Sequence, residues 1–243
     1  MKFGVKTYDS KEFLDYLLDK ADFFEVQAIR KNDYSFLKNY SGKKSIVIHC
    51  EHQGFGVNLC DSSKKEFNLG AISFAQKLAD LTNSKKIIVH LGYLEEGNKN
   101  CLRENAIELL KEINDKRICV ENVPYIARGF NGISFGSSPK EIKEVCREVG
   151  CGFCFDINHA IDFARDLHKD IYLVIKEFEM FNPNHYHLGG QNIEKGISHL
   201  DFKDSNLDLE KIFSLLNKNA EITLEVGINE KEVEKDLKIV REI

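Results

Sequence analysis

Eight short apolar segments, each followed by a longer and more polar stretch, constrain the fold of this chain more than any other feature. The segments are five to seven residues long and rich in Val, Ile and Phe. Such runs are typical of strands that are buried on both faces of a sheet. We therefore expect strands at residues 3–8, 23–29, 45–50, 86–91, 117–122, 151–156, 185–189 and 221–226.

Helical patterns lie between these segments, with apolar residues recurring at helical spacing. One helix is marked by Ser138 as its cap, Pro139 in its first turn and Gly150 at its end. Alternating strands and helices indicate an α/β fold with parallel strands, and eight strands favour closure into a (β/α)8 barrel. The expected helices lie at 10–21, 69–83, 101–114, 138–150, 160–181, 207–217 and 229–243.

The chain is predicted to form a single domain over residues 1–243. A (β/α)8 barrel needs about 250 residues, so this length leaves little room for insertions. An open doubly wound sheet is the alternative, but it favours a glycine-rich phosphate loop after the first strand, which is absent here. Long loops at 51–68, 123–137 and 189–206 each follow a strand, so the active site is expected at the C-terminal face of the strands.

The composition indicates which kinds of partner the protein binds and in which compartment it resides. A net charge of −5 argues against a strong general nucleic-acid footprint, which usually shows a basic excess. No apolar run reaches the ~20 residues of a membrane span. The seven cysteines form an odd set and the N-terminus turns polar at once, so we expect free thiols in the cytoplasm. Cys151 and Cys154 form a CxxC within a strand-like run, which we interpret as structural.

Residue types that bind metals gather at the ends of the predicted strands. From the third strand to the eighth, each strand end or the loop after it carries His, Asp or Glu. The set consists of His49, His52, His90, Glu121, Asp156, His159, His187, His199 and Glu225. The strand ends of a barrel meet at one face, so these side chains are expected to converge.

Convergence of this kind favours a metal site. Buried carboxylates that face one point repel one another and lose hydration, and a divalent cation relieves both costs. Imidazole and carboxylate ligands suit Zn²⁺, Mn²⁺ or a similar ion. Each residue alone also has a structural explanation: His49 as a core histidine, Asp156 as a helix cap, or Glu225 as the partner of a buried Arg.

The sequence resembles the xylose isomerase-like TIM-barrel superfamily, which includes endonuclease IV (AP endonuclease family 2) and many sugar isomerases and epimerases. The resemblance extends from the first strand to Glu225. It is carried by HQGFGVNL (52–59), IIVHLG (87–92), CVEN (119–122), FDINHA (155–160), YHLGG (186–190) and LEVG (224–227).

The resemblance implies specific roles for these residues. Glu121 corresponds to a bridging carboxylate, and Glu121 with Glu225 to the catalytic pair. His52 rather than His49 would be the ligand of the third strand, although the residues themselves leave that choice open. Roughly one to three divalent ions per chain, Zn²⁺ or Mn²⁺, would be bound. The implied metal ligands are His52, His90, Glu121, Asp156, His159, His187, His199 and Glu225, and the implied substrate contacts are Phe55, Arg128 and His159.

The loop after the seventh strand departs from the endonuclease IV pattern. His199 keeps its place, but Ile197 stands where that family has Asp, and the expected glycines of the loop are missing. Related epimerases carry an Arg shortly after the His of the seventh strand, whereas this chain has Asn192 there.

Two activities follow as expectations. The first is a metal-dependent phosphodiester hydrolase that acts on a sugar-phosphate or abasic-DNA-like substrate, and it is favoured by the pair His52 and His90. The alternative is a sugar or sugar-phosphate isomerase or epimerase in which Glu121 and Glu225 move the proton. A barrel that keeps its metal only for structure is a third, less favoured interpretation, because a structural zinc site is usually closed and four-coordinate.

Overall fold

Eight parallel strands close into a barrel in the computed structural model, which describes residues 1–127 and 129–243. Neighbours in the barrel follow the order of the chain, and the first strand pairs with the last. Every predicted strand corresponds to one of these eight, so the predicted (β/α)8 barrel is confirmed. The strands are β1 (Lys2–Thr7), β2 (Phe23–Gln27), β3 (Ser45–His49), β4 (Ile87–Val89), β6 (Ile118–Glu121), β8 (Gly152–Asp156), β9 (His185–Leu188) and β12 (Glu221–Leu224).

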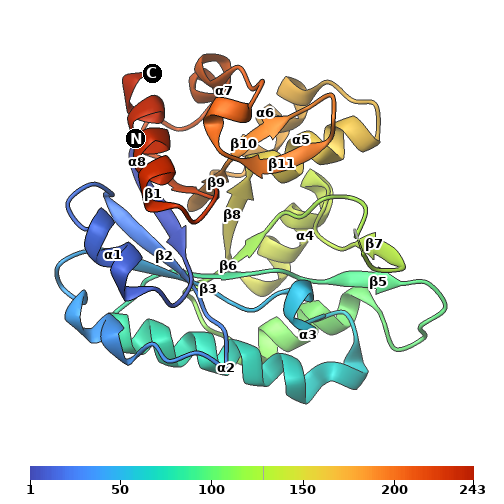
Figure 1. Ribbon diagram of the computed structural model, residues 1–243. Helices are drawn as coiled ribbons and strands as arrows, with labels where there is room; N and C mark the ends of the chain where they lie inside the picture. The colour runs from blue at the N-terminus through green and yellow to red at the C-terminus, as the bar shows by residue number, and fades with distance from the viewer. Residues whose placement is uncertain (128) are drawn as a thin grey trace.

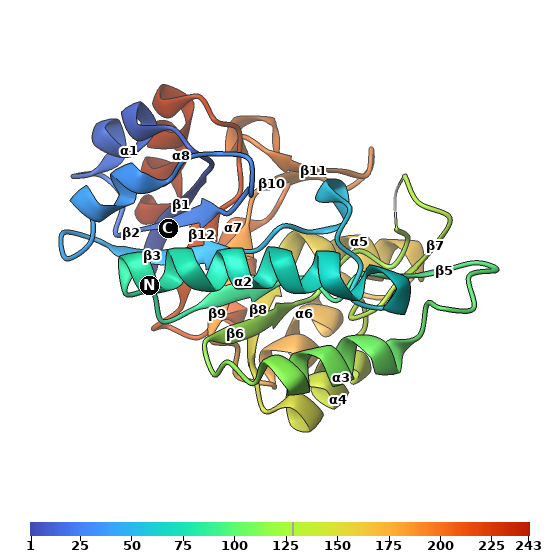
Figure 2. The ribbon, with the colours of Figure 1, turned by 90° about the horizontal axis from the view of Figure 1, so that it is seen from below.

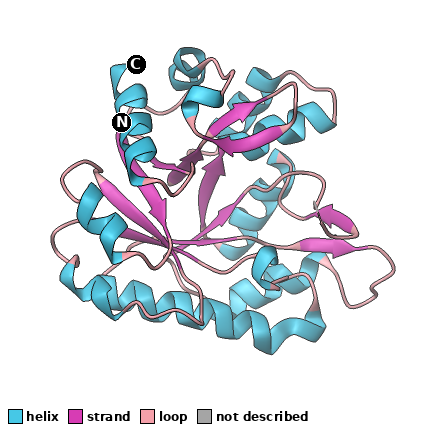
Figure 3. Ribbon diagram, viewed as in Figure 1, coloured by secondary structure: helices cyan, strands magenta, loops and turns pink. Residues whose placement is uncertain are grey.

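Helices surround the strands, as Figures 1 and 3 show. The longest, α2, packs on β3 and β4 and runs across the front of the molecule in Figure 2. Ser138 and Glu141 form the reciprocal capping box that starts α4. The helices are α1 (Lys11–Leu17), α2 (Lys65–Thr82), α3 (Arg103–Ile113), α4 (Pro139–Val149), α5 (Ile157–Asp166), α6 (Ile171–Glu179), α7 (Leu209–Leu215) and α8 (Glu230–Glu242).

The helical layer differs from the prediction in two places. The helix expected over 160–181 is two helices, because His168 adopts a left-handed backbone with φ 54° and Asp170 caps the second one at Leu173. The strict alternation of strand and helix also fails after β2, where the described chain forms a short 3-10 helix, Ser35–Asn39, in place of an α-helix.

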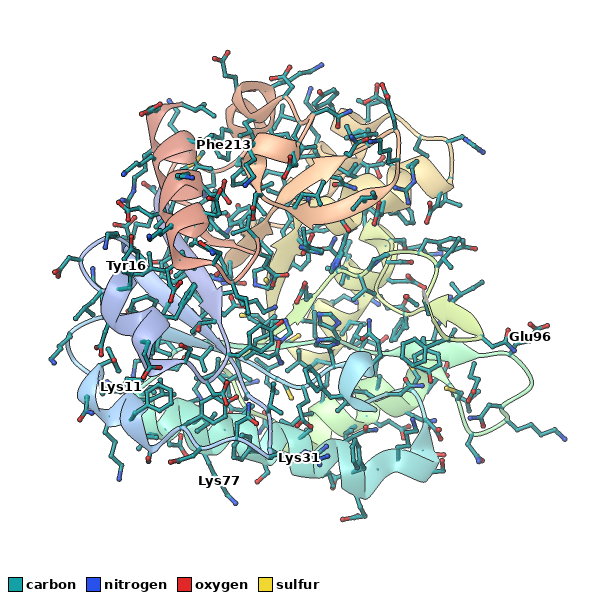
Figure 4. The ribbon with its side chains drawn as sticks, viewed as in Figure 1. Lys11, Tyr16, Lys31, Lys77, Glu96 and Phe213 are labelled. Carbon is teal, nitrogen blue, oxygen red and sulfur yellow. The ribbon has the colours of Figure 1, made fainter. Side chains whose placement is uncertain are left out.

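Two small two-stranded sheets extend the C-terminal face of the barrel. Strand β5 (Tyr93–Glu95) pairs with β7 (Gly132–Ser134), and β10 (Gly190–Asn192) pairs with β11 (Ile197–Leu200). Two of the regions predicted as loops therefore contain strands: 189–206 forms the pair β10–β11, and 123–137 contributes β7, which pairs with β5 outside that region. Glu96, just after β5, lies at the outer edge of the molecule (Figure 4).

The barrel interior is apolar below the strand ends, on the side of the N-terminal ends of the strands, which we call the lower part. Phe23, Val47, Ile88, Cys119 and Cys154 form a cluster of their own inside the strands, separate from the main core between strands and helices. Gly4 makes room for it, since a Cβ there would lie 2.3 Å from the ring of Phe23.

The seven cysteines carry free thiols, as expected. Within residues 1–127 and 129–243, no helix combines the length and the apolar character that crossing a membrane requires.

Candidate metal centre

The ends of the barrel strands carry a ring of buried histidines and carboxylates. The parallel register explains the convergence: Lys6 pairs with Glu25, and Asp156 pairs with His187. These positions share a level of the barrel, and their side chains meet in its interior. The structure brings together all the carboxylates predicted for the site, and all the predicted histidines lie in it or beside it, namely His52, His90, Glu121, Asp156, His159, His187, His199 and Glu225.

Glu121 lies at the centre of this ring. Its Oε2 atom is 2.9 Å from His90 Nε2 and 3.1 Å from His49 Nε2. Its Oε1 atom is 3.2 Å from His187 Nδ1 and 3.5 Å from His159 Nδ1. One carboxylate therefore faces a histidine group with each of its oxygens.

Three histidine rings are oriented by oxygen atoms that contact their Nδ1 atoms. The Nδ1 atoms of His49 and His159 each lie 2.8 Å from a main-chain carbonyl, those of Cys50 and Asn122. His90 Nδ1 lies 3.1 Å from the side-chain oxygen of Gln53. A carbonyl oxygen accepts, so in the neutral form of each imidazole the proton sits on Nδ1 and the lone pair of Nε2 is left for the site.

His187 is held in the opposite sense by a carboxylate that the sequence analysis missed. Its Nε2 lies 2.9 Å from Glu25 Oε2, so Nδ1 is the free atom, 3.0 Å from Glu225 Oε1. Glu25 is fully buried and also accepts hydrogen bonds from His185 and Thr223. A carboxylate behind an imidazole is the usual support of a metal-binding histidine.

Lys6 is the second site residue that the strand-end pattern did not reveal. Its ammonium bonds to Glu225 and lies 3.7 Å from Glu25. The signal in the sequence is a single charged residue within each of two apolar strands, FGVKT and FFEVQ.

Asp156, His159 and His199 form a neighbouring group. Asp156 Oδ1 caps the next helix at the amide of His159, and Oδ2 lies 3.5 Å from His159 Nδ1. The two histidines approach to 3.4 Å between their Nε2 atoms. His199 adopts a left-handed backbone with φ 57°, which is uncommon for a residue with a Cβ. Gly189 lets the main chains of Glu225 and His199 lie close to it. A Cβ on Gly189 would be 2.3 Å from the carbonyl oxygen of Glu225 and 3.0 Å from the Cα of His199.

His52 and Phe55 lie to one side of the ring. His52 stacks on His90 with ring centroids 5.1 Å apart, and its Nδ1 accepts a hydrogen bond from the amide of Gly54. Phe55 packs edge-on against His52 at 4.9 Å. His52, unlike His49, belongs to none of the ligand groups found in the described chain. Arg128, expected near the substrate, lies outside the described residues.

The donor set fits divalent metal ions. Four groups of histidine, carboxylate and cysteine side chains in the described chain place one potential ligand atom each within 4.8 Å of the others. Buried Asp156 Oδ2, His187 Nδ1 and His199 Nδ1 have no hydrogen-bond partner. In the neutral forms of His49 and His90, the Nε2 lone pairs face a carboxylate oxygen of Glu121, which is a contact between acceptors. A cation between such atoms removes the conflict.

Burial and mutual charge shift the pKa values of these groups. Burial near Glu121 and Glu225 raises the pKa of Asp156 to about 8. Burial would raise that of Glu121 too, but His90 and His187 outweigh it and hold its pKa well below the usual value. Burial disfavours charge on Lys6, yet the surrounding carboxylates raise its pKa.

A cavity of about 390 Å³ opens over the ring. The ring side chains form its floor, and its rim includes Tyr8, Ile126 and Ile228, whose side chains are exposed. Within the described lining, Lys6 is the sole lysine and there is no arginine. Arg30 is paired with Glu51 and is not part of the described lining of the cavity.

Comparisons with known proteins agree with this architecture. The sequence profile described as xylose isomerase-like TIM barrel matches residues 21–243. A D-tagatose 3-epimerase-like protein is similar in structure, with 21% identity and a TM-score of 0.71, over 100% of this chain and 99% of that one. Endonuclease IV from Thermus thermophilus has 16% identity and a TM-score of 0.73, over 100% and 98%.

A third similar structure is D-psicose 3-epimerase from Clostridium cellulolyticum with D-tagatose. It has 11% identity and a TM-score of 0.70, over 100% of this chain and 99% of that one. The search of curated proteins found no match. At these identities the structural likeness establishes the fold.

Proposed function

Because the chain belongs to the xylose isomerase-like TIM-barrel family, we propose that its ring of histidines and carboxylates binds divalent metal ions and that the protein is a metal-dependent phosphoester hydrolase. The observation that carries this proposal is the position of Glu121. One of its oxygens faces His49 and His90, and the other faces Nδ1 of His187 at 3.2 Å. A carboxylate in that position can bridge two ions, which is the arrangement that suits phosphodiester displacement.

The first ion would be held by His49, His90 and Glu121. His49 is favoured over His52 as the ligand of the third strand, because Nδ1 of His52 accepts from Gly54. In neutral His52 the proton then sits on Nε2, which makes that atom a donor toward the cavity. His52 would accordingly contact the substrate.

A second ion would be held by Glu121, Asp156, His187 and Glu225. His159 and His199 extend this set on the side of Asp156. When bound, divalent ions supply positive charge that polarises phosphoryl or carbonyl oxygens and acidifies water. The ions would be Zn²⁺ or Mn²⁺, since both accept mixtures of imidazole and carboxylate.

The protein side chains would orient the reactants around these ions. Glu225 lies at the cavity wall and its Oε2 is 3.5 Å from His199 Nδ1. It is placed to accept the proton of an attacking water. Lys6 beside it would favour the ionised carboxylate.

The cavity supports a small substrate. About 390 Å³ suits a sugar phosphate, and an apolar rim suits the flat face of a sugar ring. Duplex DNA is usually held by several basic side chains on phosphates, and in the described lining Lys6 alone has that character. A sugar phosphate ester is therefore proposed ahead of abasic DNA.

A sugar epimerase or isomerase is the second candidate, and one contact favours it. His187 Nδ1 is 3.2 Å from Glu121 Oε1 and 3.0 Å from Glu225 Oε1, so two carboxylates flank one ligand position. A pair of this kind can remove a proton from a sugar carbon on one side and return it on the other.

One set of assays separates the candidates. Protein purified without chelator is analysed for metal, then offered phosphodiester and phosphomonoester model substrates, an abasic-site duplex, and a panel of ketoses in D₂O. Hydrolysis of a phosphoester that EDTA abolishes and metal restores supports the hydrolase, whether the product is inorganic phosphate from a monoester or a monoester and an alcohol from a diester. Deuterium exchange into a ketose without phosphate release supports the epimerase. Absence of bound metal even after reconstitution would refute both.

A further inference from the structure

We infer that the ammonium of Lys6 acts as a built-in cation on the Glu25–Glu225 side of the ring, so that this side takes no metal ion and acquires a metal site only when the lysine is removed. The inference rests on the proposed metal centre and concerns which of its ligand groups is filled.

Lys6 is fixed in place by strand pairing. It lies at the end of β1, level with Glu25 on β2, and β1 pairs on its other side with β12, which leads into Glu225. Its Nζ bonds to Glu225 Oε1 and lies 3.7 Å from Glu25 Oε1. The side chain is only 15% exposed, so water screens these charges weakly.

The group that Lys6 touches looks complete as a metal site. Glu25, His49, His187 and Glu225 place four potential ligand atoms within 4.8 Å of one another. Among the four groups of the described chain, this one alone contains Glu25.

The ring nitrogens of its two histidines nevertheless already face other groups. The Nδ1 of His49 is held by the carbonyl of Cys50, and Nε2 faces Glu121 at 3.1 Å. The Nε2 of His187 is held by Glu25 itself at 2.9 Å, which leaves Nδ1 for Glu121 and Glu225. A metal that used Nε2 of His187 would break the bond between His187 and Glu25 that orients the ring.

What remains of the group is two buried carboxylates, and Lys6 contacts both. A buried carboxylate without a partner costs several kcal/mol, so this pair needs a positive charge between or beside it. The ammonium supplies that charge without demanding the histidine nitrogens. Removing it leaves the Oε1 atoms of Glu25 and Glu225 without the ammonium beside them, while Oε2 of Glu25 keeps its hydrogen bonds. A divalent ion then becomes the available compensation for these two oxygens.

The test counts ions in the full-length protein. Wild type, Lys6→Gln and Lys6→Arg are equilibrated with Zn²⁺, passed through a desalting column, and analysed for zinc per chain. We expect Lys6→Gln to retain an additional ion relative to wild type. We expect Lys6→Arg, which keeps the charge, to match wild type. A Lys6→Gln protein that binds no more zinc than wild type would overturn the inference.

The double variant Lys6→Gln/Glu25→Gln locates the additional ion. Because Glu25 belongs to this group alone, the double variant should fall back to the wild-type zinc content. If it keeps the additional ion, the ion sits elsewhere and the inference is wrong.

Anomalous diffraction from zinc-loaded wild-type crystals gives an answer even if the variants do not fold. Zinc peaks at the Glu121 and Asp156 groups, with Lys6 still on Glu225, support the inference. A peak between Glu25 and Glu225, with Lys6 displaced, refutes it.

The same experiment distinguishes this inference from the proposed function. Wild type that binds no zinc refutes the metal centre as a whole. Wild type that binds zinc, with Lys6→Gln gaining none, refutes the role of Lys6 and leaves the metal centre standing.

Discussion

The lower and upper parts of the barrel interior are built from the same strands but differ in what they need. The lower cluster of Phe23, Val47, Ile88, Cys119 and Cys154 is apolar and fills its space by packing. The upper ring contains buried polar atoms without partners, such as Asp156 Oδ2 and His187 Nδ1. The first region is satisfied by packing, whereas the second contains polar atoms that the proposed cation would satisfy.

The largest expected effect is on the upper ring. Glu121→Gln keeps the shape of the side chain but removes the charge that faces both histidine groups, so we expect activity to fall by about 10³-fold. The measurement is kcat/KM for the substrate that the assays proposed above reveal, with Glu96→Gln at the exposed outer edge as the matched control (Figure 4). Full activity in Glu121→Gln would show that this residue is not the centre of the site.

Metal should stabilise the protein through the upper ring. An ion that binds the folded state alone adds about 4 kcal/mol to the free energy of unfolding when its concentration is about a thousand times its dissociation constant. We expect urea unfolding to shift upward with added Zn²⁺ and to return after EDTA. A midpoint independent of metal would argue that the ring is satisfied without a cation.

The lower cluster should behave in the opposite way. Ile88 is fully buried, and Ile88→Ala is expected to cost about 2–5 kcal/mol of stability through the cavity it leaves. The loss should be the same in metal-loaded and metal-free protein, with unchanged zinc content. A loss that differs between the two forms would mean that the two regions are not independent.

The smallest effect is expected at the N-terminal rim below the lower cluster. Burial raises the pKa of Glu221, but hydrogen bonds from Lys86 and Lys2 outweigh it and lower the pKa from 4.5 to about 2. Since the folded pKa is lowered, the stabilisation is present above pH 4.5 and is lost as the pH falls through 2.

Glu221 is one-third exposed, so its contribution is about 1 kcal/mol. Glu221→Gln should be less stable than wild type at pH 7 by that amount, and the difference should shrink between pH 4.5 and 2. A difference that stays constant over this range would assign it to packing instead of charge.

The fold was predictable because its signals are local and repeated. Eight apolar runs and their spacing were enough to place every barrel strand, and a shared barrel level placed the residues at their ends. The break between α5 and α6 was not predictable from periodicity, because the apolar pattern continues through His168 while only the backbone turns.

The histidines and carboxylates of the ring could be predicted from the sequence. The residues that orient them were harder to predict. Glu25 lies inside a strand, and charged residues are seldom buried. A charged residue at such a position does not by itself indicate a functional site. The choice of His49 or His52 as the metal ligand of the third strand depends on the partner of Nδ1. In His49 that partner is a carbonyl oxygen, and in His52 it is an amide N–H. That distinction exists only after the chain has folded.

Glu25 has a consequence for engineering this barrel. Its Oε2 accepts from His187 at 2.9 Å and from His185 at 3.1 Å, and Lys86 lies 3.5 Å from the far nitrogen of His185. Lys86 belongs to the N-terminal face, where substitutions in such barrels are ordinarily made for thermal robustness without regard to catalysis. Here that face is connected to a ligand histidine by two intervening side chains. Variants at Lys86 should therefore be screened for zinc affinity as well as for melting temperature.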